Sequence, residues 1–523
     1  MKKRISMLLC GVMIGSLVLT GCNGGDKSIS DELSSNNREP ERRVSEAVIV
    51  ERELLSDNNC TEMQIEIESG EEYAELTENG FINASDENTS TFSADVDTAS
   101  YSNIRRMINN NYSLEEIPVD AVRIEEMINY FSYDYAKPKG GEPFGVTMDS
   151  AICPWNSDNN IIRIGLSTED IDFSEAPSSN LVFLLDVSGS MSDNNKLPLL
   201  IKAFTMLINE LGEKDKVSIV TYAGCESVVL EGVSCDQKED IINALENLEA
   251  GGSTNGSSGI EKAYELAKEN FIKGGNNRVI IATDGDFNVG ITDINELEDF
   301  ISDKRKSGIF LSALGFGMGN YGDSTLETLA DKGNGNYAYI DDIQEAKKVM
   351  VEELGANFNT VAKDVKLQVE FNSEFVEQYR LIGYENRVMA NEDFEDDTKD
   401  AGEIGAGHCV TALYEVVMKD SYDVNSAEND KWMDLRIRYK EPDGDTSKEL
   451  EYSTGANDYV ESTDKDFSFA LAVAEFGLLL RNSEYKAEAS FNNVITLAKQ
   501  SEGCNDTYKN EFITLVDKIA FVN

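Results

Sequence analysis

The chain has 523 residues, 41% of them hydrophobic, and its 97 acidic against 46 basic residues give a formal net charge of −51. This length suits about two to four domains, and the hydrophobic fraction is sufficient for folded cores. So acidic a surface repels phosphate backbones and anionic lipid headgroups, which argues against nucleic acid as a partner. Most of the charge serves solubility, and attraction for cations becomes specific only where oxygen ligands cluster.

The N-terminus has the pattern of a secretory signal. Lys2 to Arg4 are positive, Ile5 to Leu19 are apolar, and Leu19-Thr20-Gly21-Cys22 follows. The stretch is short and ends in small residues, which distinguishes it from a membrane-spanning helix. Its ending resembles a bacterial lipobox, so residues 1–21 are predicted to be removed and Cys22 to carry lipid. The alternative is a plain signal peptide with a chance cysteine. We expect an extracytoplasmic protein, lipid-anchored to a bacterial membrane through Cys22.

Two regions precede the main α/β pattern. Residues 22–88 are polar and acidic with poor periodicity, which predicts a flexible tether. Residues 89–178 form an N-terminal region with helical spacing of apolar residues in Tyr101–Asn109 and Val119–Tyr130. Within it, Asp97 or Thr98 is predicted to be a helix N-cap, because no apolar strand precedes this pair.

Strands and helices alternate over residues 179–357, which predicts a mainly parallel sheet with helices on both faces. The predicted strands are Leu181–Asp186, Val217–Tyr222, Val228–Leu230, Arg278–Asp284, Ile309–Phe316 and Tyr337–Ile340. The predicted helices are Leu197–Leu211, Lys238–Leu248, Ser258–Phe271, Ile294–Lys306, Ser324–Lys332 and Ile343–Leu354.

Residues 358–523 read as strands followed by helices, the latter from Phe467 to Phe521. Two segments before the α/β block, Phe144–Met148 and Ile161–Ile164, resemble the later strands. We therefore predict one β-rich domain built from both flanks, with the α/β domain inserted into it. The later strands are Asp364–Phe371, Arg380–Tyr384, Val410–Met418 and Trp432–Tyr439.

Carboxylates and hydroxyls follow two of the predicted parallel strands. Asp186-Val187-Ser188-Gly189-Ser190 comes directly after Leu181–Leu185, and Asp284 ends the strand beginning at Val279. A glycine-rich loop, Gly251–Asn255, adds Thr254. Ligands of open α/β sheets bind at the carboxyl edge, and all-oxygen clusters suit hard divalent cations. The alternative, a purely structural loop, leaves two buried carboxylates without a cation, at a cost in free energy.

This ordered set resembles the metal-ion-dependent adhesion site (MIDAS) of von Willebrand factor type A (VWA) domains. The resemblance implies a VWA fold in which Ser188 and Ser190 ligate the metal directly. Thr254 would ligate it directly or through water. Asp186 and Asp284 would act mostly through waters and hydrogen bonds. The expected ion is Mg²⁺, with Mn²⁺ and Ca²⁺ as alternatives, and the last ligand would be an Asp or Glu carboxylate of a protein partner.

From about residue 90 to the C-terminus the chain resembles the YfbK-type bacterial VWA lipoproteins, a family without a defined biochemical activity. The matching segments are Ser93–Tyr101, Ser188–Met191, Ala250–Gly256, Ala282–Gly290, Gly333–Ile340, Tyr384–Arg387 and Asp400–Gly407.

Other chemistry is sparse. No Cys-x-x-Cys pair indicates structural zinc, and Cys225 and Cys235 are equally compatible with a disulfide and with free thiols. The single histidine, His408, reads as a loop residue without function. Without a Gly-x-Ser-x-Gly or His-Glu-x-x-His motif we expect no enzyme but a metal-dependent protein-binding module of the cell envelope. The alternative is a metal-dependent hydrolase acting on envelope material.

Overall fold

The computed structural model describes residues 71, 73–94, 96–171, 176–223, 226–252, 259–285, 294–318, 322–422, 429–442, 444–501 and 506–522. All of them belong to one compact unit, Ile67–Asn523. The predicted signal and Cys22 lie outside the described residues. Within the described ranges, no helix is both long and apolar enough to cross a membrane.

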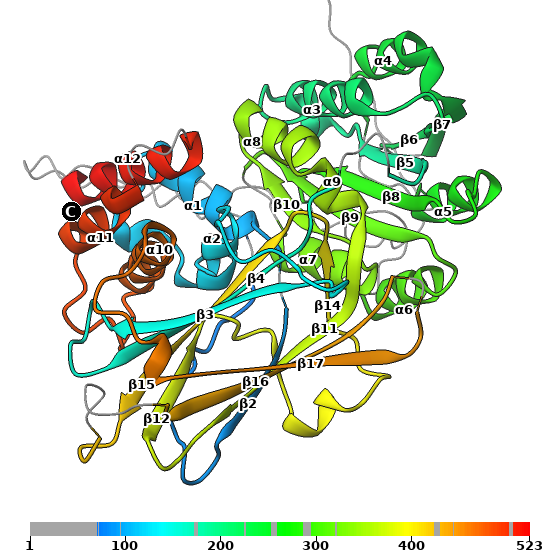
Figure 1. The fold of residues 1–523 in the computed structure, drawn as a ribbon. Helices are drawn as coiled ribbons and strands as arrows, with labels where there is room; N and C mark the ends of the chain where they lie inside the picture. Colours follow the sequence, from blue (N-terminus) through cyan, green and yellow to red (C-terminus); the bar gives the residue numbers. More distant parts are fainter. Residues whose placement is uncertain are drawn as a thin grey trace, which may run out of the picture. The chain divides into compact units, whose positions relative to one another are not determined.

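The α/β block forms a six-stranded sheet in the order β10-β9-β8-β5-β6-β7 (Figure 1). The neighbours pair in parallel except for β7, which runs antiparallel to β6 at the edge. The sheet matches the prediction of a mainly parallel arrangement. Its strands are β5 (Ser179–Asp186), β6 (Lys216–Tyr222), β7 (Glu226–Ser234), β8 (Asn276–Thr283), β9 (Phe310–Phe316) and β10 (Tyr337–Ile340).

Helices cover both faces of this sheet because its central strands are apolar throughout. Along β5, Leu181, Phe183 and Leu185 pack into one hydrophobic core, and Val182 and Leu184 pack into another on the opposite face. The helices are α3 (Leu197–Glu210), α4 (Lys238–Glu246), α5 (Gly259–Glu269), α6 (Ile294–Arg305), α7 (Asp323–Lys332), α8 (Ile343–Lys347) and α9 (Leu354–Phe358).

The flanks of the block pair with each other in two further sheets. One has the order β1-β12-β15-β4-β3, and the other has the order β13-β2-β11-β16-β17, with β14 attached to β11. Strand β4 (Asn160–Ser167) pairs antiparallel with β15 (Cys409–Met418), from Cys409 opposite Ser167 to Val416 opposite Asn160. This pairing confirms the predicted β-rich domain with an inserted α/β domain. The remaining strands are β1 (Ile82–Asn83), β2 (Thr89–Ser93), β3 (Gly145–Ile152), β11 (Thr360–Phe371), β12 (Val376–Ile382), β13 (Val388–Met389), β14 (Gly402–Gly405), β16 (Lys431–Lys440) and β17 (Ser447–Gly455).

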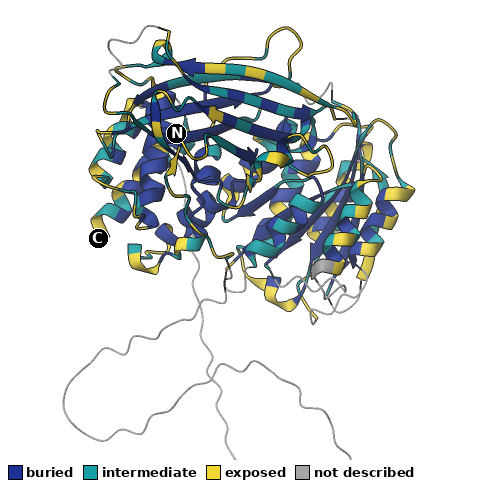
Figure 2. Ribbon diagram, turned by 90° about the horizontal axis from the view of Figure 1, so that it is seen from below, coloured by how far each residue is buried: buried dark blue, intermediate teal, exposed yellow. Residues whose placement is uncertain are grey.

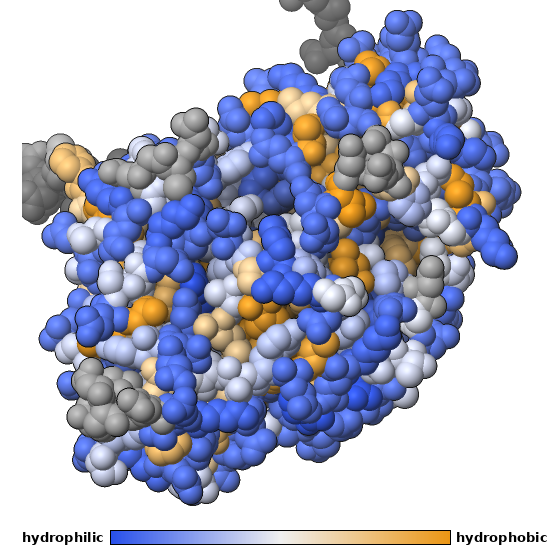
Figure 3. Space-filling model, in the orientation of Figure 1, coloured by the Kyte–Doolittle hydropathy of each residue, from blue (hydrophilic) through white to orange (hydrophobic). Residues whose placement is uncertain are grey.

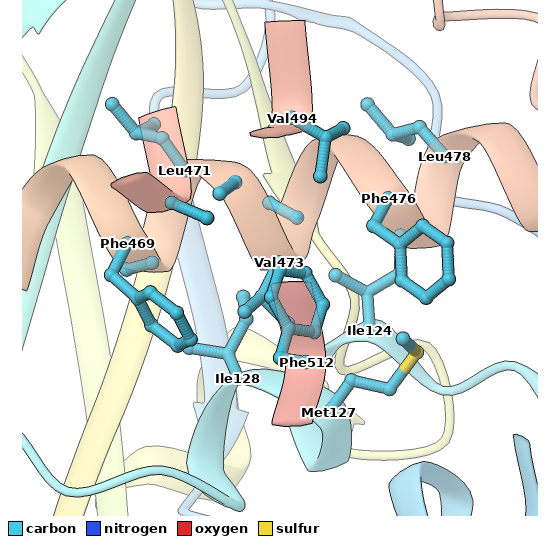
Figure 4. Close-up of a cluster of buried hydrophobic side chains, with 14 of the residues drawn as sticks. Ile124, Met127, Ile128, Phe469, Leu471, Val473, Phe476, Leu478, Val494 and Phe512 are labelled. Atoms are coloured by element: carbon cyan, nitrogen blue, oxygen red, sulfur yellow. The ribbon is translucent and has the colours of Figure 1, made fainter. Parts of the chain in front are cut away.

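The sheet that contains β4 is a middle layer, buried on both faces. Ile162 and Ile164 face a core shared with the second sheet, whereas Ile161 and Leu413 contribute to a core formed with helices. Phe469 and Phe476 of α10 meet α2 and Phe512 there (Figure 4). Helices and strands turn buried faces inward and exposed faces outward (Figure 2). The helices are α1 (Ala99–Asn109), α2 (Ile124–Asn129), α10 (Lys465–Leu480), α11 (Phe491–Ala498) and α12 (Thr507–Val522).

Several predicted boundaries need correction. Ile82 pairs with Tyr379 through β1 and β12, so the folded part begins before residue 88, inside the segment predicted to be a tether. The helix predicted for Val119–Tyr130 is a 3₁₀ turn, Val119–Ala121, followed by the short α2. The helix predicted for Ile343–Leu354 is interrupted by a π-helical turn, Lys348–Glu352.

The predicted N-cap position of the first helix is confirmed, but its side-chain bond is not. Thr98 occupies the N-cap position of α1 but makes no side-chain capping bond. Instead, the backbone N–H of Ser100 donates to the Glu126 carboxylate at 2.8 Å. Asp97 accepts hydrogen bonds from the backbone N–H of Tyr337 and from the Arg387 guanidinium. Asp97 therefore ties the N-terminal region to β10 and to the loop after β12.

Candidate metal centre

Sheet topology explains why the predicted ligands meet. From β5 the chain goes on to β6 on one side, and from the adjacent β8 it goes on to β9 on the other side. A crevice therefore opens at the carboxyl ends of β5 and β8. Leu185 of β5 is paired with Ala282 of β8. The residues that follow, Asp186 on one strand and Thr283 and Asp284 on the other, therefore end at the same point of the same edge.

Asp186 is the most constrained residue of this edge. Its side chain is buried, and one oxygen accepts the backbone N–H of Ser188 at 2.8 Å. The other oxygen accepts the hydroxyl of Thr283 at 3.0 Å. Burial raises the pKa of Asp186 from 3.8 to about 6, and the bonds from Ser188 and Thr283 oppose that rise. The carboxylate is oriented, but its charge is poorly compensated by its own hydrogen bonds.

The two serines present their hydroxyls to one another. Ser188 Oγ and Ser190 Oγ are 2.8 Å apart, with Ser188 buried and Ser190 exposed. They converge because the chain turns into a short 3₁₀ helix, Gly189–Ser192, immediately after Ser188. Two neutral oxygen donors thus lie beside the Asp186 carboxylate at the mouth of the crevice.

Asp284 has one paired and one unpaired oxygen. Its Oδ2 accepts a hydrogen bond from Lys196 Nζ at 2.9 Å. Its Oδ1 is buried, and within the described part of the chain it has no hydrogen-bond partner. A buried oxygen without a partner is costly unless a further group satisfies it. The orphaned oxygen fits a cation or a metal-bound water at this place.

The sequence patterns missed Lys196. It lies just before α3, where neither apolar periodicity nor a motif gives a lysine a role. Only the folded chain brings its ammonium to the end of β8. The charge pattern alone offered no signal for this contact.

The third predicted loop is only partly described. Gly251 N–H donates to Val187 O at 2.8 Å, which holds the loop against the Asp186 segment. Gly252 has a φ of +84°, and a Cβ there would lie 3.0 Å from Ala223 O, so the position requires glycine. Thr254 lies outside the described residues, and its role as a ligand stays a prediction.

The assembled donors suit a hard divalent ion. Asp186, Ser188, Ser190 and Asp284 offer only oxygen atoms, and Mg²⁺ and Mn²⁺ take such ligands.

A second group of carboxylates lies away from the predicted metal site. Asp364, Asp400 and Glu403 each place an oxygen within 4.8 Å of the others. Lys440 pairs with Asp364, and Arg305, the last residue of α6, pairs with Asp400. Helix α6 ends where the chain returns to begin β9, so this group lies at the opposite edge of the sheet. Its two basic partners already supply positive charge.

A cavity of about 450 Å³ lies between the sheet and the π-helical turn, with His408 on its wall. Burial lowers the pKa of His408 from 6.5 to about 4, so the imidazole is neutral at pH 7. Its Nδ1 is buried and has no partner among the described residues.

Of the two cysteines whose pairing the sequence left open, Cys235 is a buried free thiol, and Cys225 lies outside the described residues.

Family models match most of the chain. The von Willebrand factor type A domain model matches residues 180–352, and the model for the C-terminal part of "Uncharacterized protein YfbK" matches residues 356–522. A further von Willebrand factor model matches residues 67–163. The "Uncharacterized protein YfbK" of Escherichia coli (strain K12) is 40% identical over 469 residues, which is 85% of this chain and 80% of that protein. The chain belongs to the YfbK family.

Other similarities cover less. The "Uncharacterized protein sll0103" of Synechocystis sp. (strain ATCC 27184 / PCC 6803 / Kazusa) is 29% identical over 189 residues, 35% of this chain and 43% of that protein. A solved von Willebrand factor type A structure from Catenulispora acidiphila is 14% identical, covers 71% of this chain and 88% of its own, and superposes with a TM-score of 0.41. The family-model match over residues 180–352 shows that this YfbK-family chain contains a VWA domain, a module that commonly binds divalent metals and proteins.

Proposed function

We propose that this YfbK-family protein is a cell-envelope lipoprotein whose VWA domain holds a divalent metal ion and, through it, binds an acidic side chain of a protein partner. Adhesion, scaffolding and assembly are the processes that such binding would serve. Mg²⁺ is the proposed ion, with Mn²⁺ and Ca²⁺ as alternatives.

One observation carries the proposal. Asp186 and Asp284 end adjacent parallel strands beside the hydroxyls of Ser188 and Ser190, and Asp284 Oδ1 is buried without a partner in the described residues. Isolated buried carboxylates destabilise a fold. A cation at this edge offsets that cost, and a fold that served stability alone would not need the arrangement.

The signal pattern and the lipobox-like ending at Cys22 support the envelope location. A lipid on Cys22 would hold the protein at a bacterial membrane without a spanning helix. The polar residues that follow Cys22 would then separate the folded unit from the bilayer.

A metal-dependent hydrolase is the alternative. A cation at this site could polarise a carbonyl or phosphoryl group, but hydrolysis also needs a positioned general base. VWA domains are generally interaction modules, which favours binding. A hydrolase screen on envelope material with and without Mg²⁺ separates the two, and Mg²⁺-dependent turnover would replace the binding proposal.

The direct test is calorimetry of the full chain titrated with Mg²⁺, Mn²⁺ and Ca²⁺. We expect one ion per chain, with Ca²⁺ binding less tightly because it prefers more oxygen ligands at longer distances. Asp186→Ala should abolish the signal, and Ser188→Ala should weaken it while the fold persists. Asp193→Ala is the matched control, because Asp193 is an exposed carboxylate in the same loop. Identical isotherms for the wild type and Asp186→Ala would refute the metal site.

A second experiment addresses the partner. Capture from envelope extracts in Mg²⁺ and in EDTA should recover a protein only when the metal is present. Capture that is equal in both conditions, or equal for Asp186→Ala, would contradict binding through the ion.

A further inference from the structure

We propose that Lys196 couples metal binding to the binding of an anion: its fixed positive charge makes the bare ion bind weakly and makes a carboxylate necessary for tight binding. This inference rests on the proposed metal site and goes further by assigning a residue that sets its ligand preference.

The lysine is built into the site. Its Nζ lies 2.9 Å from Asp284 Oδ2, and the side chains of Lys196 and Asp284 are 9% and 1% exposed. The aliphatic part of Lys196 passes over Gly317, where any Cβ would collide with it. Gly317 also has a φ of +81°, a conformation that side chains rarely adopt. The backbone thus leaves space for this lysine to reach Asp284, whereas a surface lysine would sample many positions.

A count of charges gives the consequence. Asp186 and Asp284 contribute two carboxylates and Lys196 one ammonium, so the site carries a net charge of about −1. A divalent ion changes this to about +1, and an Asp or Glu carboxylate then brings it to about zero. Without the ammonium the ion alone would neutralise the site, and an anion would add little.

Repulsion sets the strength of the effect. The Lys196 ammonium donates to Oδ2 of Asp284, and Oδ1 of the same carboxylate has no partner among the described residues. An ion placed near Asp284 therefore lies within a few ångströms of Lys196, and the side chains of both residues are buried. Unit charges at such distances interact strongly enough to change an affinity by about tenfold or more.

Calorimetry of the full chain with Mn²⁺ at pH 8 tests the inference. The titrations run in sodium chloride and in sodium acetate of equal ionic strength, with acetate as the carboxylate probe. The variants are Lys196→Met, which keeps the aliphatic part, and Lys196→Gln, which is neutral but can donate to Asp284. Lys196→Arg keeps the charge. Lys202→Met is the control, because it removes the same charge from an exposed site on α3.

We expect Lys196→Met and Lys196→Gln to bind Mn²⁺ about tenfold more tightly than the wild type in chloride. Acetate should tighten binding by the wild type and Lys196→Arg but not by the two neutral variants. Lys202→Met should match the wild type. If Lys196→Met is unstable in a thermal melt, Lys196→Gln decides the result.

The outcomes separate the two proposals. If neither the wild type nor any variant binds Mn²⁺, both the metal site and the role of Lys196 are refuted. If the wild type binds but the neutral variants bind equally or more weakly, or keep the acetate effect, the metal site stands and the role of Lys196 is refuted.

Discussion

Asp186 and Asp284 show what a buried charge requires of its surroundings. Asp186 is oriented by a backbone N–H and a hydroxyl, and Asp284 is half neutralised by Lys196. Replacing Asp186 by Ala therefore has two opposite effects. It removes a metal ligand, and it also removes a desolvated charge whose burial costs free energy. Loss of metal binding with little loss of stability is the expected pattern.

His408 gives a clear pH prediction because it is the only histidine of the chain. Burial lowers its pKa from 6.5 to about 4. As the pH falls below 6.5, the His408 imidazole takes up a proton in the unfolded state but stays neutral in the folded state. The free energy of unfolding therefore decreases until about pH 4. The loss amounts to at most about 3 kcal/mol. His408→Gln should unfold with a shallower acid dependence than the wild type over this range.

Urea titrations at several pH values measure that difference, and an NMR titration of the single imidazole measures the pKa directly. An imidazole that titrates near 6.5 would show that the cavity wall is hydrated and would contradict the prediction.

The sequence could predict which residues meet at one edge of the sheet after an apolar strand, and it missed those whose position depends on a distant partner. Asp186, Ser188, Ser190 and Asp284 were predicted because each follows an apolar strand within its own segment. Lys196 was missed because its partner is brought in by another strand. His408 was predicted to be a loop residue, and its position between β14 and β15 is correct, but the burial of its Nδ1 arises from packing that no local pattern reports.

At the level of elements, arginines outside the VWA domain neutralise carboxylates inside it. Arg123 contacts Asp323 at 2.7 Å and Glu327 at 2.9 Å, both on α7, and all three side chains are buried. This arrangement explains the wrong helix prediction around it. Arg123 is extended, with φ −98° and ψ 110°, and the chain becomes helical only at Ile124. Helical periodicity could not reveal that interruption, because its cause lies in another domain.

Arg123→Met should destabilise the chain by about 3–5 kcal/mol, because it removes the cation that pairs with the buried carboxylates of Asp323, Glu327 and Glu126, of which Glu327 keeps Arg387 nearby. Urea unfolding followed by circular dichroism measures the change. Lys306→Met is the control: Lys306 pairs with Asp303 at 3.0 Å, but the two side chains are 69% and 77% exposed. An exposed pair contributes less than about 1 kcal/mol. Equal effects of the two substitutions would mean that the buried ion pairs stabilise the fold no more than an exposed pair does.

Strands and helices were both predicted only in part: β4 and β15 were predicted, whereas β17 was not. The alternation of β4 and β15 supplies two apolar faces, one for the second sheet and one for the helices, and the pattern is visible in the sequence. The helix from Ile343 was predicted to be continuous because its apolar spacing continues, but Lys348–Glu352 forms a π-helical turn. That turn lies along the cavity between domains, so tertiary packing determined it.

Considered as a whole, the described molecule is covered by hydrophilic residues on the face in Figure 3, with hydrophobic residues gathered near its middle. The two domains share buried ion pairs: Arg105 of α1 contacts Asp341 and Glu345 of the VWA domain. We therefore expect the chain to unfold in one cooperative transition. Differential scanning calorimetry should give a calorimetric enthalpy equal to the van't Hoff enthalpy. Two separate transitions would show that the domains unfold independently.

The anchor is a prediction about the whole protein in its cell. Cys22→Ala should release the chain from membranes or leave the precursor uncleaved, because the lipid is the only attachment that the sequence predicts. Globomycin should block processing of the wild type. Fractionation and immunoblotting measure both effects, and normal maturation and membrane retention of Cys22→Ala would contradict the lipobox assignment.

The insertion of one domain into another also affects how the protein reaches its folded state. Strand β4 cannot complete its pairing until β15 has been synthesised, and the whole VWA domain lies between them. Closing so long an unfolded loop costs entropy and slows pairing. Ile171, on the way into the insertion, lies next to Gly355, on the way out. Once the VWA domain has folded, its entry and exit segments lie side by side. The folded domain therefore holds the end of β4 near the start of β11. A substitution in the VWA core should then delay assembly of the two flanking sheets and expose their strands to aggregation or proteolysis, even though it touches none of them.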